Sequence, residues 1–144
     1  MRAMVITEPG GPEVLQIQEV ADPVPGDGEV LIAVKAFGVN HAETHMRKGE
    51  WPEATPISGI EAVGTVVTDP SGVLAEGTKV LTIMGGLGRT RNGSYAEYTL
   101  APAANVARIE TSLAPSECSS SIRSGRRVVA ITPAPTSLAM LTAA

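Results

Sequence analysis

The chain has 144 residues, a formal net charge of −4 and 43% hydrophobic residues. This length suits one domain with its own core and is short for two, and the acidic balance gives no electrostatic reason to expect nucleic acid or an anionic membrane as a partner. The single cysteine, Cys118, excludes an internal disulfide and fits a cytoplasmic location. No stretch approaches the roughly 20 apolar residues of a transmembrane helix, and the prolines and glycines of residues 9–12 interrupt any signal-peptide core.

Short β-type runs alternate with turn signals along most of the chain. The expected strands cover residues 2–7, 14–20, 29–37, 59–69, 79–84, 94–100 and 104–109. In residues 29–37, Val30, Ile32 and Val34 share one face by the two-residue period of a strand. Residues 59–69 are largely apolar on both faces, which predicts a central strand. With one helix expected, at residues 42–48, the pattern predicts a mainly β barrel or sandwich.

Residues 38–52 (GVNHAETHMRKGEWP) place an amide, two histidines, a hydroxyl and an indole directly after an expected strand. Polar groups at such a position are a common way to build a site. His41 and His45 have the i, i+4 spacing of a zinc pair, but Ala42 stands where the hydrolytic zinc motif needs a glutamate. Glu43 points about 200° away from His41 around a helix. Without a third ligand nearby, the pattern favours polar cleft or surface histidines.

Three other segments suggest chemistry only weakly. Residues 85–93 (GGLGRTRNG) join glycines to two arginines, yet they lead into a strand, whereas a dinucleotide loop opens a helix. The loop at residues 132–137 contains no glycine and two prolines, so its backbone amides are poorly suited to a pyrophosphate. Cys118 lies in a serine run with no expected helix N-terminus or basic partner, which favours an incidental thiol.

Several ordered pieces together carry a family resemblance. They include AFGVNHAETHMRKG, SGIEAVGTVV, EGTKVL and GSYAEYTLAPAANVARI. With their order and spacing, residues 1 to about 117 resemble the N-terminal, GroES-like domain of medium-chain dehydrogenases/reductases, in particular the zinc-independent quinone oxidoreductase branch. The resemblance implies a GroES-like, partly open β-barrel with short helices and no complete Rossmann domain.

The resemblance also implies a site without zinc. Zinc-dependent relatives carry a cysteine after the strand and a histidine in a GHE turn, and this chain has Asn40 and Ile60 at those positions. An amide is a poor zinc ligand and isoleucine is none. The four-cysteine lobe of such relatives is absent as well, because Cys118 is the only cysteine.

In full-length members of the family, a nicotinamide cofactor docks between this domain and a second, dinucleotide-binding domain. Hydride then passes to an activated C=C bond or a quinone carbonyl. By this resemblance Asn40 is catalytic and cofactor-binding, with a hydrogen bond near the nicotinamide ribose or the substrate oxygen, and Thr44 lines the nicotinamide side. His45 and Trp51 line the substrate pocket, His45 in place of a common tyrosine. NADPH is implied, although this chain lacks the domain that would hold it.

A domain boundary is expected near Ser116, with residues 1–117 as the GroES-like domain and residues 118–144 as an atypical tail. The strand-like run at residues 127–132 is either a return segment that closes the barrel or part of a truncation remnant, and the second interpretation is slightly preferred. The chain is then expected to be a truncated oxidoreductase domain, inactive alone. The alternative is a stand-alone binding or assembly module, with an exposed apolar surface that favours a homo-oligomer.

Overall fold

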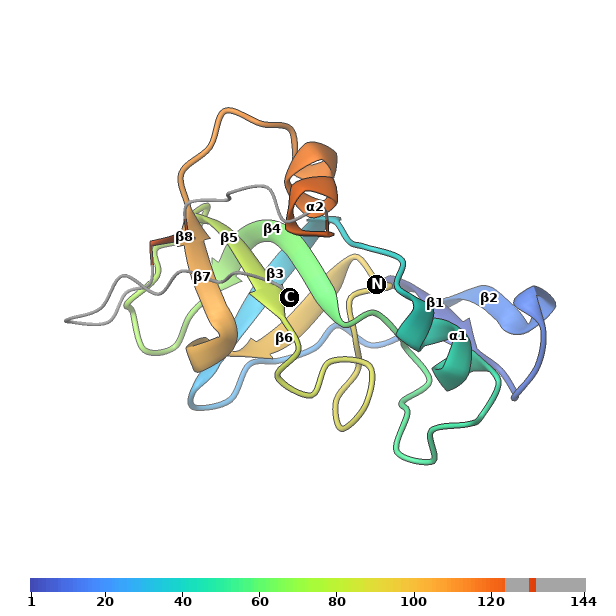
Figure 1. Cartoon of the computed structure of the whole chain (residues 1–144). Helices are drawn as coiled ribbons and strands as arrows, with labels where there is room; N and C mark the ends of the chain where they lie inside the picture. The colour runs from blue at the N-terminus through green and yellow to red at the C-terminus, as the bar shows by residue number, and fades with distance from the viewer. Residues whose placement is uncertain (124–129, 132–144) are drawn as a thin grey trace.

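The computed structural model describes residues 1–123 and 130–131. Within them, two antiparallel sheets form the body of the molecule (Figure 1). The smaller sheet pairs β1 (Arg2–Ile6) with β2 (Leu15–Glu19). The larger sheet has the strand order β6–β3–β4–β5–β7–β8. Its strands are β3 (Glu29–Ala36), β4 (Glu61–Thr68), β5 (Lys79–Ile83), β6 (Tyr98–Pro102), β7 (Val106–Ile109) and β8 (Ala130–Ile131).

Helical elements connect these strands. They are the 3₁₀ turns η1 (Pro12–Val14) and η2 (Ala103–Asn105) and the α-helices α1 (His41–Arg47) and α2 (Pro115–Arg123). The described residues are therefore mainly β, in two sheets that do not close into a complete barrel, which confirms the predicted partly open architecture. None of their helices is long and apolar enough to cross a membrane.

The largest apolar core cluster is built mainly from neighbouring strands of the larger sheet. Val30 and Ile32 of β3 are completely buried, and they pack with Val66 of β4 and Val80 of β5 in one apolar cluster. β4 pairs with β3 on one side and β5 on the other, as its apolar faces predicted. The close β3–β4 approach depends on Gly64, because a Cβ there would lie 2.2 Å from the carbonyl oxygen of Ala33.

The small sheet is attached to the loops that surround α1. Backbone N–H groups of Met4 and Ile6 donate to the carbonyl oxygens of Tyr95 (2.8 Å) and Pro56 (2.8 Å). Ala3 and Ile57 bury their side chains against Tyr95. The small sheet is thus joined to the segment that follows α1 and to the segment before β6.

One predicted strand is displaced. Residues 94–100 were expected to be a strand, but β6 begins at Tyr98. Ser94 instead donates its hydroxyl hydrogen to the carbonyl oxygen of Glu61 (2.5 Å) and its backbone N–H to Gly59 (3.1 Å). Ala96 bridges Ala3 of the small sheet. The alternating pattern of this segment therefore serves two different pairings before it joins β6, and no single strand spans it.

The chain near residue 117 is helical, which the sequence analysis did not predict. The side chain of Glu117 accepts the backbone N–H of Ala114 (2.7 Å) at the start of α2. Cys118 is 1% exposed and packs with Val63 and Leu81, so it is a core residue. It lies near the start of α2, so the expectation that no helix N-terminus lies beside it was wrong. The expected domain boundary between residues 117 and 118 falls within this helix.

The strand-like run at residues 127–132 is only partly within the described residues. Two of its residues form β8, with Ile131 opposite Arg108 and Ala130 opposite Ile109 on β7. This pairing makes β8 the sixth strand, at one edge of the larger sheet. The loop at residues 132–137 lies outside the described residues.

Candidate active site

β3 ends at Ala36, and the helix α1 follows it because Asn40 and Glu43 are residues that favour the start of a helix. Asn40 is the N-cap residue, a position that asparagine favours, and forms a capping box with Glu43 three residues later. The helix ends at Arg47 with Lys48 as its C-cap, and Gly49 follows with a φ of +75°, the left-handed conformation that often terminates helices. The sequence prediction placed the helix one residue late.

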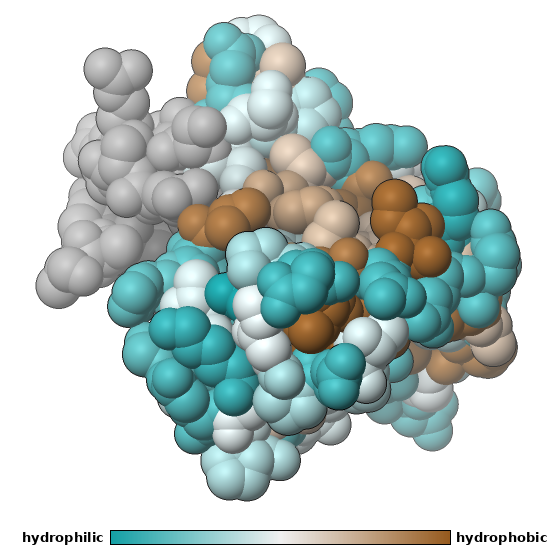
Figure 2. All heavy atoms as spheres, turned by 90° about the vertical axis from the view of Figure 1, so that its right-hand side faces the viewer, coloured by the Kyte–Doolittle hydropathy of each residue, from teal (hydrophilic) through white to brown (hydrophobic). Residues whose placement is uncertain are grey.

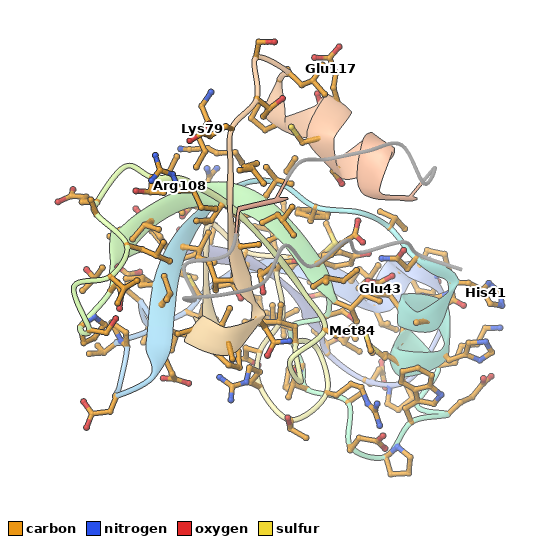
Figure 3. All side chains as sticks on the ribbon, turned by 60° about the vertical axis from the view of Figure 1, so that its left-hand side comes forward. His41, Glu43, Lys79, Met84, Arg108 and Glu117 are labelled. Carbon is orange, nitrogen blue, oxygen red and sulfur yellow. The ribbon has the colours of Figure 1, made fainter. Side chains whose placement is uncertain are left out.

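Glu43 is the polar centre of this region. It is 5% exposed, and its carboxylate accepts the backbone N–H of Asn40, the Asn40 side-chain amide (Nδ2, 3.3 Å) and the backbone N–H of Ile60 (3.2 Å). Figure 3 shows Glu43 on the inner side of α1, toward the strands, while His41 projects from the outer side. The expected opposite orientation of these two side chains is confirmed. Glu43 itself was not among the predicted site residues.

Thr44 directly follows Glu43 on α1 and is half-buried. Its hydroxyl donates to the backbone carbonyl of His41 at 2.6 Å. The proton of this hydroxyl is therefore directed back onto the helix, and the oxygen lone pairs remain as acceptors for an incoming group.

Ring and guanidinium groups form a row along the outer side of α1. The His41 and His45 rings meet edge to face at 4.9 Å, and His45 stacks on Trp51 at 6.4 Å with an interplanar angle of 10°. The guanidinium of Arg89 lies 5.2 Å from the Trp51 ring centroid, within cation–π range. The row places the two predicted pocket residues, His45 and Trp51, side by side.

Two exposed carboxylates bind members of this row. Glu50 bonds to Nδ1 of His45, and this hydrogen bond lowers the pKa of Glu50 from its ordinary value. Glu53 accepts a hydrogen bond from Arg89, which lowers the pKa of the Glu53 carboxyl. Both contacts hold long side chains in place at the surface.

The glycine-rich loop at residues 85–93 borders the same region and shows no phosphate cradle. Its Arg89 pairs with Glu53 and its Arg91 with Glu29 (2.7 Å), so both guanidinium groups already meet carboxylates. The loop follows Met84, whose φ of +62° is unusual for a residue with a side chain and whose side chain is 49% exposed. The Met84 backbone N–H donates to the Ile60 carbonyl at 2.7 Å, which joins this loop to the segment that Glu43 holds.

Within the part of the chain that the structure describes, the α1 residues other than Glu43 and Met46 are partly or fully exposed. A cavity of about 570 Å³ is found elsewhere, between the small sheet and the β3–β6 edge, and the ion pair of Arg91 and Glu29 lies in its wall. A hollow of about 280 Å³ lies beside Phe37 and Tyr95. Neither is lined by the α1 side chains. Chemistry at α1 would therefore need a second surface to exclude water.

The described side chains around α1 do not form a zinc site. Asn40 and Ile60 are brought together through Glu43, but an amide and an isoleucine supply no zinc-binding pair. His41 and His45 are adjacent, with Glu50 beside His45. Across the part of the chain that the structure describes, no group of three or more His, Cys, Asp or Glu residues is arranged to hold a metal ion.

Comparison with known proteins identifies the domain. Residues 26–111 match the alcohol dehydrogenase GroES-like domain family. The chain belongs to this family. Within the medium-chain dehydrogenase/reductase superfamily it is similar to the human quinone oxidoreductase, with 40% identity over 107 residues that cover 70% of this chain and 31% of the relative.

Solved structures agree with this assignment. A mycobacterial protein whose structure was determined in complex with NADPH has a TM-score of 0.67 and 35% identity, and the match covers 80% of this chain and 35% of that one. A quinone oxidoreductase from Pseudomonas syringae has a TM-score of 0.70 and 28% identity over 79% of this chain and 35% of its own. The GroES-like domain described here thus spans about a third of the length of these relatives, and it corresponds to their N-terminal domain.

Of the predicted site residues, the GroES-like domain places His45 and Trp51 in direct contact and sets Asn40 and Thr44 on the first turns of the same helix. Their roles toward a cofactor or substrate remain predictions. The sequence analysis missed Glu43 and Met84. The Asn-x-x-Glu spacing was a detectable capping-box signal for Glu43, whereas no local pattern indicated the backbone conformation of Met84.

Proposed function

We propose that this domain is the substrate side of an NAD(P)H-dependent, zinc-independent oxidoreductase that reduces quinones or related α,β-unsaturated carbonyl compounds. The observation that carries the proposal is the single short helix that presents Asn40, Thr44 and the His45–Trp51 stack on an open surface. The stack offers a flat, partly apolar wall of the kind that planar ligands favour. The similarity to quinone oxidoreductases supports the substrate class.

The residues have distinct proposed roles. Asn40 positions a hydrogen bond near the nicotinamide ribose or the substrate oxygen, and Thr44 lines the nicotinamide side with acceptor lone pairs. His45 and Trp51 pack against the substrate ring. When bound, NAD(P)H supplies the hydride, and these side chains set the distance and orientation at which a substrate meets it.

The described residues fit only the nicotinamide end of such a cofactor. The polar groups on α1 lie within a few residues of one another. The arginines of the glycine-rich loop are paired with Glu29 and Glu53, and the loop does not lead into a helix. The adenosine and diphosphate of the cofactor would therefore be held by a second domain. Asn40 and Ile60, at the positions of a zinc-binding cysteine and histidine in zinc-dependent relatives, support a site that works without zinc.

We expect the 144-residue chain to be inactive alone, because half of a cleft cannot hold the hydride donor against its substrate. The decisive experiment joins residues 1–123, which keep α2 whole, to the remainder of human quinone oxidoreductase and measures quinone-dependent NADPH oxidation. The fusion should be active, and Asn40→Ala should lower kcat/KM about tenfold or more, since one lost polar contact to a developing charge commonly costs at least that.

Asn92→Ala is the matched control, because Asn92 is an exposed amide outside α1. A folded fusion that binds NADPH but reduces no quinone or enone would contradict the proposed function. Robust turnover by the 144-residue chain alone would contradict its expected inactivity.

A stand-alone binding or assembly module is the second candidate. Figure 2 shows brown, apolar atoms gathered within a hydrophilic surround on the face turned toward the viewer. Among the described residues, exposed fractions of 38% for Phe37, 60% for Val39 and 49% for Met84 indicate apolar side chains available to a partner. This reading expects a homo-oligomer in the cytoplasm, and a strict monomer by light scattering at high concentration would argue against it.

A further inference from the structure

Glu43 links the two backbone segments that carry Asn40 and Ile60, and no role has been assigned to it above. One oxygen, Oε2, accepts the backbone N–H of Asn40. The other, Oε1, accepts both the Asn40 side-chain amide (3.3 Å) and the backbone N–H of Ile60 (3.2 Å). A carboxylate that is 5% exposed and meets three N–H donors has both of its oxygens hydrogen-bonded within the fold.

We propose that Glu43 is the positioning residue of the α1 site, which fixes the side-chain orientation of Asn40 and locks the start of α1 to the backbone before β4. This inference rests on the proposed function, because it assigns Asn40 the ligand-facing role. Glu43 itself is turned inward, away from the open surface, so it acts through Asn40 (Figure 3).

The orientation of the Asn40 amide follows from elementary hydrogen-bond chemistry. A carboxylate oxygen accepts hydrogen bonds, so the NH₂ end of the amide must face Glu43 and the carbonyl end cannot. Rotation of the amide by half a turn would set two acceptor oxygens against each other in a partly buried place, which is unfavourable. Glu43 therefore selects one of the two amide orientations and presents the same hydrogen-bonding pattern to every ligand.

The lock extends beyond Asn40. The Ile60 carbonyl accepts the Met84 backbone N–H at 2.7 Å, so the chain of contacts runs from Glu43 through Ile60 to the loop after β5. Three segments that are distant in sequence thus share one network at the site. Loss of the carboxylate should move Asn40 and Ile60 together, whereas an ordinary helix cap would affect only its own helix.

Two substitutions separate these contacts. Glu43→Gln keeps the length but has one carbonyl oxygen, so in either orientation an NH₂ group faces at least one of the former N–H donors. Glu43→Asp keeps both oxygens on a side chain that is shorter by one methylene, so it can cap the helix without reaching Ile60. Glu117→Gln is the matched control, because Glu117 makes the same kind of contact, to the Ala114 backbone N–H, at the start of α2.

The experiment records amide NMR spectra of the 144-residue chain with and without nicotinamide mononucleotide, a probe for the nicotinamide end alone. The chain has three asparagines, so the Asn40 side-chain amide is readily assigned with Asn40→Asp. In Glu43→Gln, the Asn40 side-chain and Ile60 backbone amides should shift and exchange with solvent at least tenfold faster, and nucleotide affinity should fall at least fivefold. Glu43→Asp should retain part of the affinity, and Glu117→Gln all of it.

Unchanged Asn40 and Ile60 amides in Glu43→Gln, or unchanged nucleotide affinity despite shifted amides, would overturn the positioning role. A general loss of structure is recognised separately, because it would shift amides throughout the sheets. If the unsubstituted chain shows no nucleotide-dependent shift at Asn40 or Thr44, the proposed function fails at this site. The amide signals of Glu43→Gln would then still decide whether Glu43 orients Asn40.

Discussion

Replacement of Gly64 by alanine should destabilise the fold strongly, because β3 and β4 are too close to admit a side chain there. The added Cβ would lie 2.2 Å from the Ala33 carbonyl oxygen and 2.7 Å from Cγ2 of Ile32. A carbon and a carbonyl oxygen normally stay roughly 3.3 Å apart or more. The strands would have to separate by about 1 Å, which weakens ladder hydrogen bonds on a strand that is paired on both sides.

The magnitude follows from opposing terms. Overpacking of a core costs about 1–3 kcal/mol, and each weakened hydrogen bond adds about 1 kcal/mol. Alanine recovers about 0.5–1 kcal/mol of the conformational entropy that glycine loses in a strand. The net loss is about 2–3 kcal/mol, or a fall in Tm of about 8–10 °C for a domain of this size.

Thermal unfolding followed by circular dichroism measures this change. Gly26→Ala is the matched control, because Gly26 has no positive φ and the nearest atom to its added Cβ is a flexible Glu29 oxygen at 3.6 Å. The control should melt within about 2 °C of the parent chain or slightly above it. If Gly64→Ala also melts within about 2 °C of the parent, the inferred β3–β4 contact is incorrect.

Three further outcomes are expected. The buried Cys118 thiol should react with a thiol reagent about a hundredfold more slowly in the native chain than in denaturant, and immediate labelling would show that α2 is not packed as described. His45→Gln should raise the pKa of Glu50, measured by carboxyl ¹³C NMR. Because the fold lowers this pKa, the pair stabilises the fold at pH values above the ordinary pKa of a glutamate. This contribution is lost as the pH falls through the pKa of Glu50 in the folded chain. Arg89→Gln should raise the pKa of Glu53 in the same titration, with no change at Glu50.

The strands were predictable because their signals are local. Alternation in β3 and the two apolar faces of β4 follow from the side-chain period and from burial on both sides, and both were confirmed. The segment at residues 94–97 was not, since its backbone pairs first with Gly59 and then with Ala3, partners that no local pattern reveals. α2 was missed because its serine-rich sequence has weak helix preference, and tertiary packing of Cys118 overrides that preference.

The contacts of the candidate site also differ in whether local sequence could predict them. The contact of His45 with Trp51 follows from a helix and the turn after it, so residue types and spacing were enough to place them near each other. Arg89 joins the stack across 38 positions of sequence, and nothing in its own loop indicated that contact. Met84 adopts its left-handed conformation because the chain turns there immediately after β5, with its N–H held by Ile60.

The contrast between Glu43 and the outer row explains how an open surface can hold a defined geometry. His45, Trp51 and Arg89 are partly exposed, and their stacking and ion pairs belong to the class of surface contacts that contribute little individually. Glu43 is buried and its three N–H partners come from two segments, so its contacts resist rearrangement without help from a second domain. A ligand meeting this surface would find Asn40 already oriented, while the ring row could still adjust to the shape of the substrate. Because preorganisation reduces the ordering cost of binding, changes at Glu43 should weaken all ligands of the site alike, and changes at His45 or Trp51 should alter the preference among them.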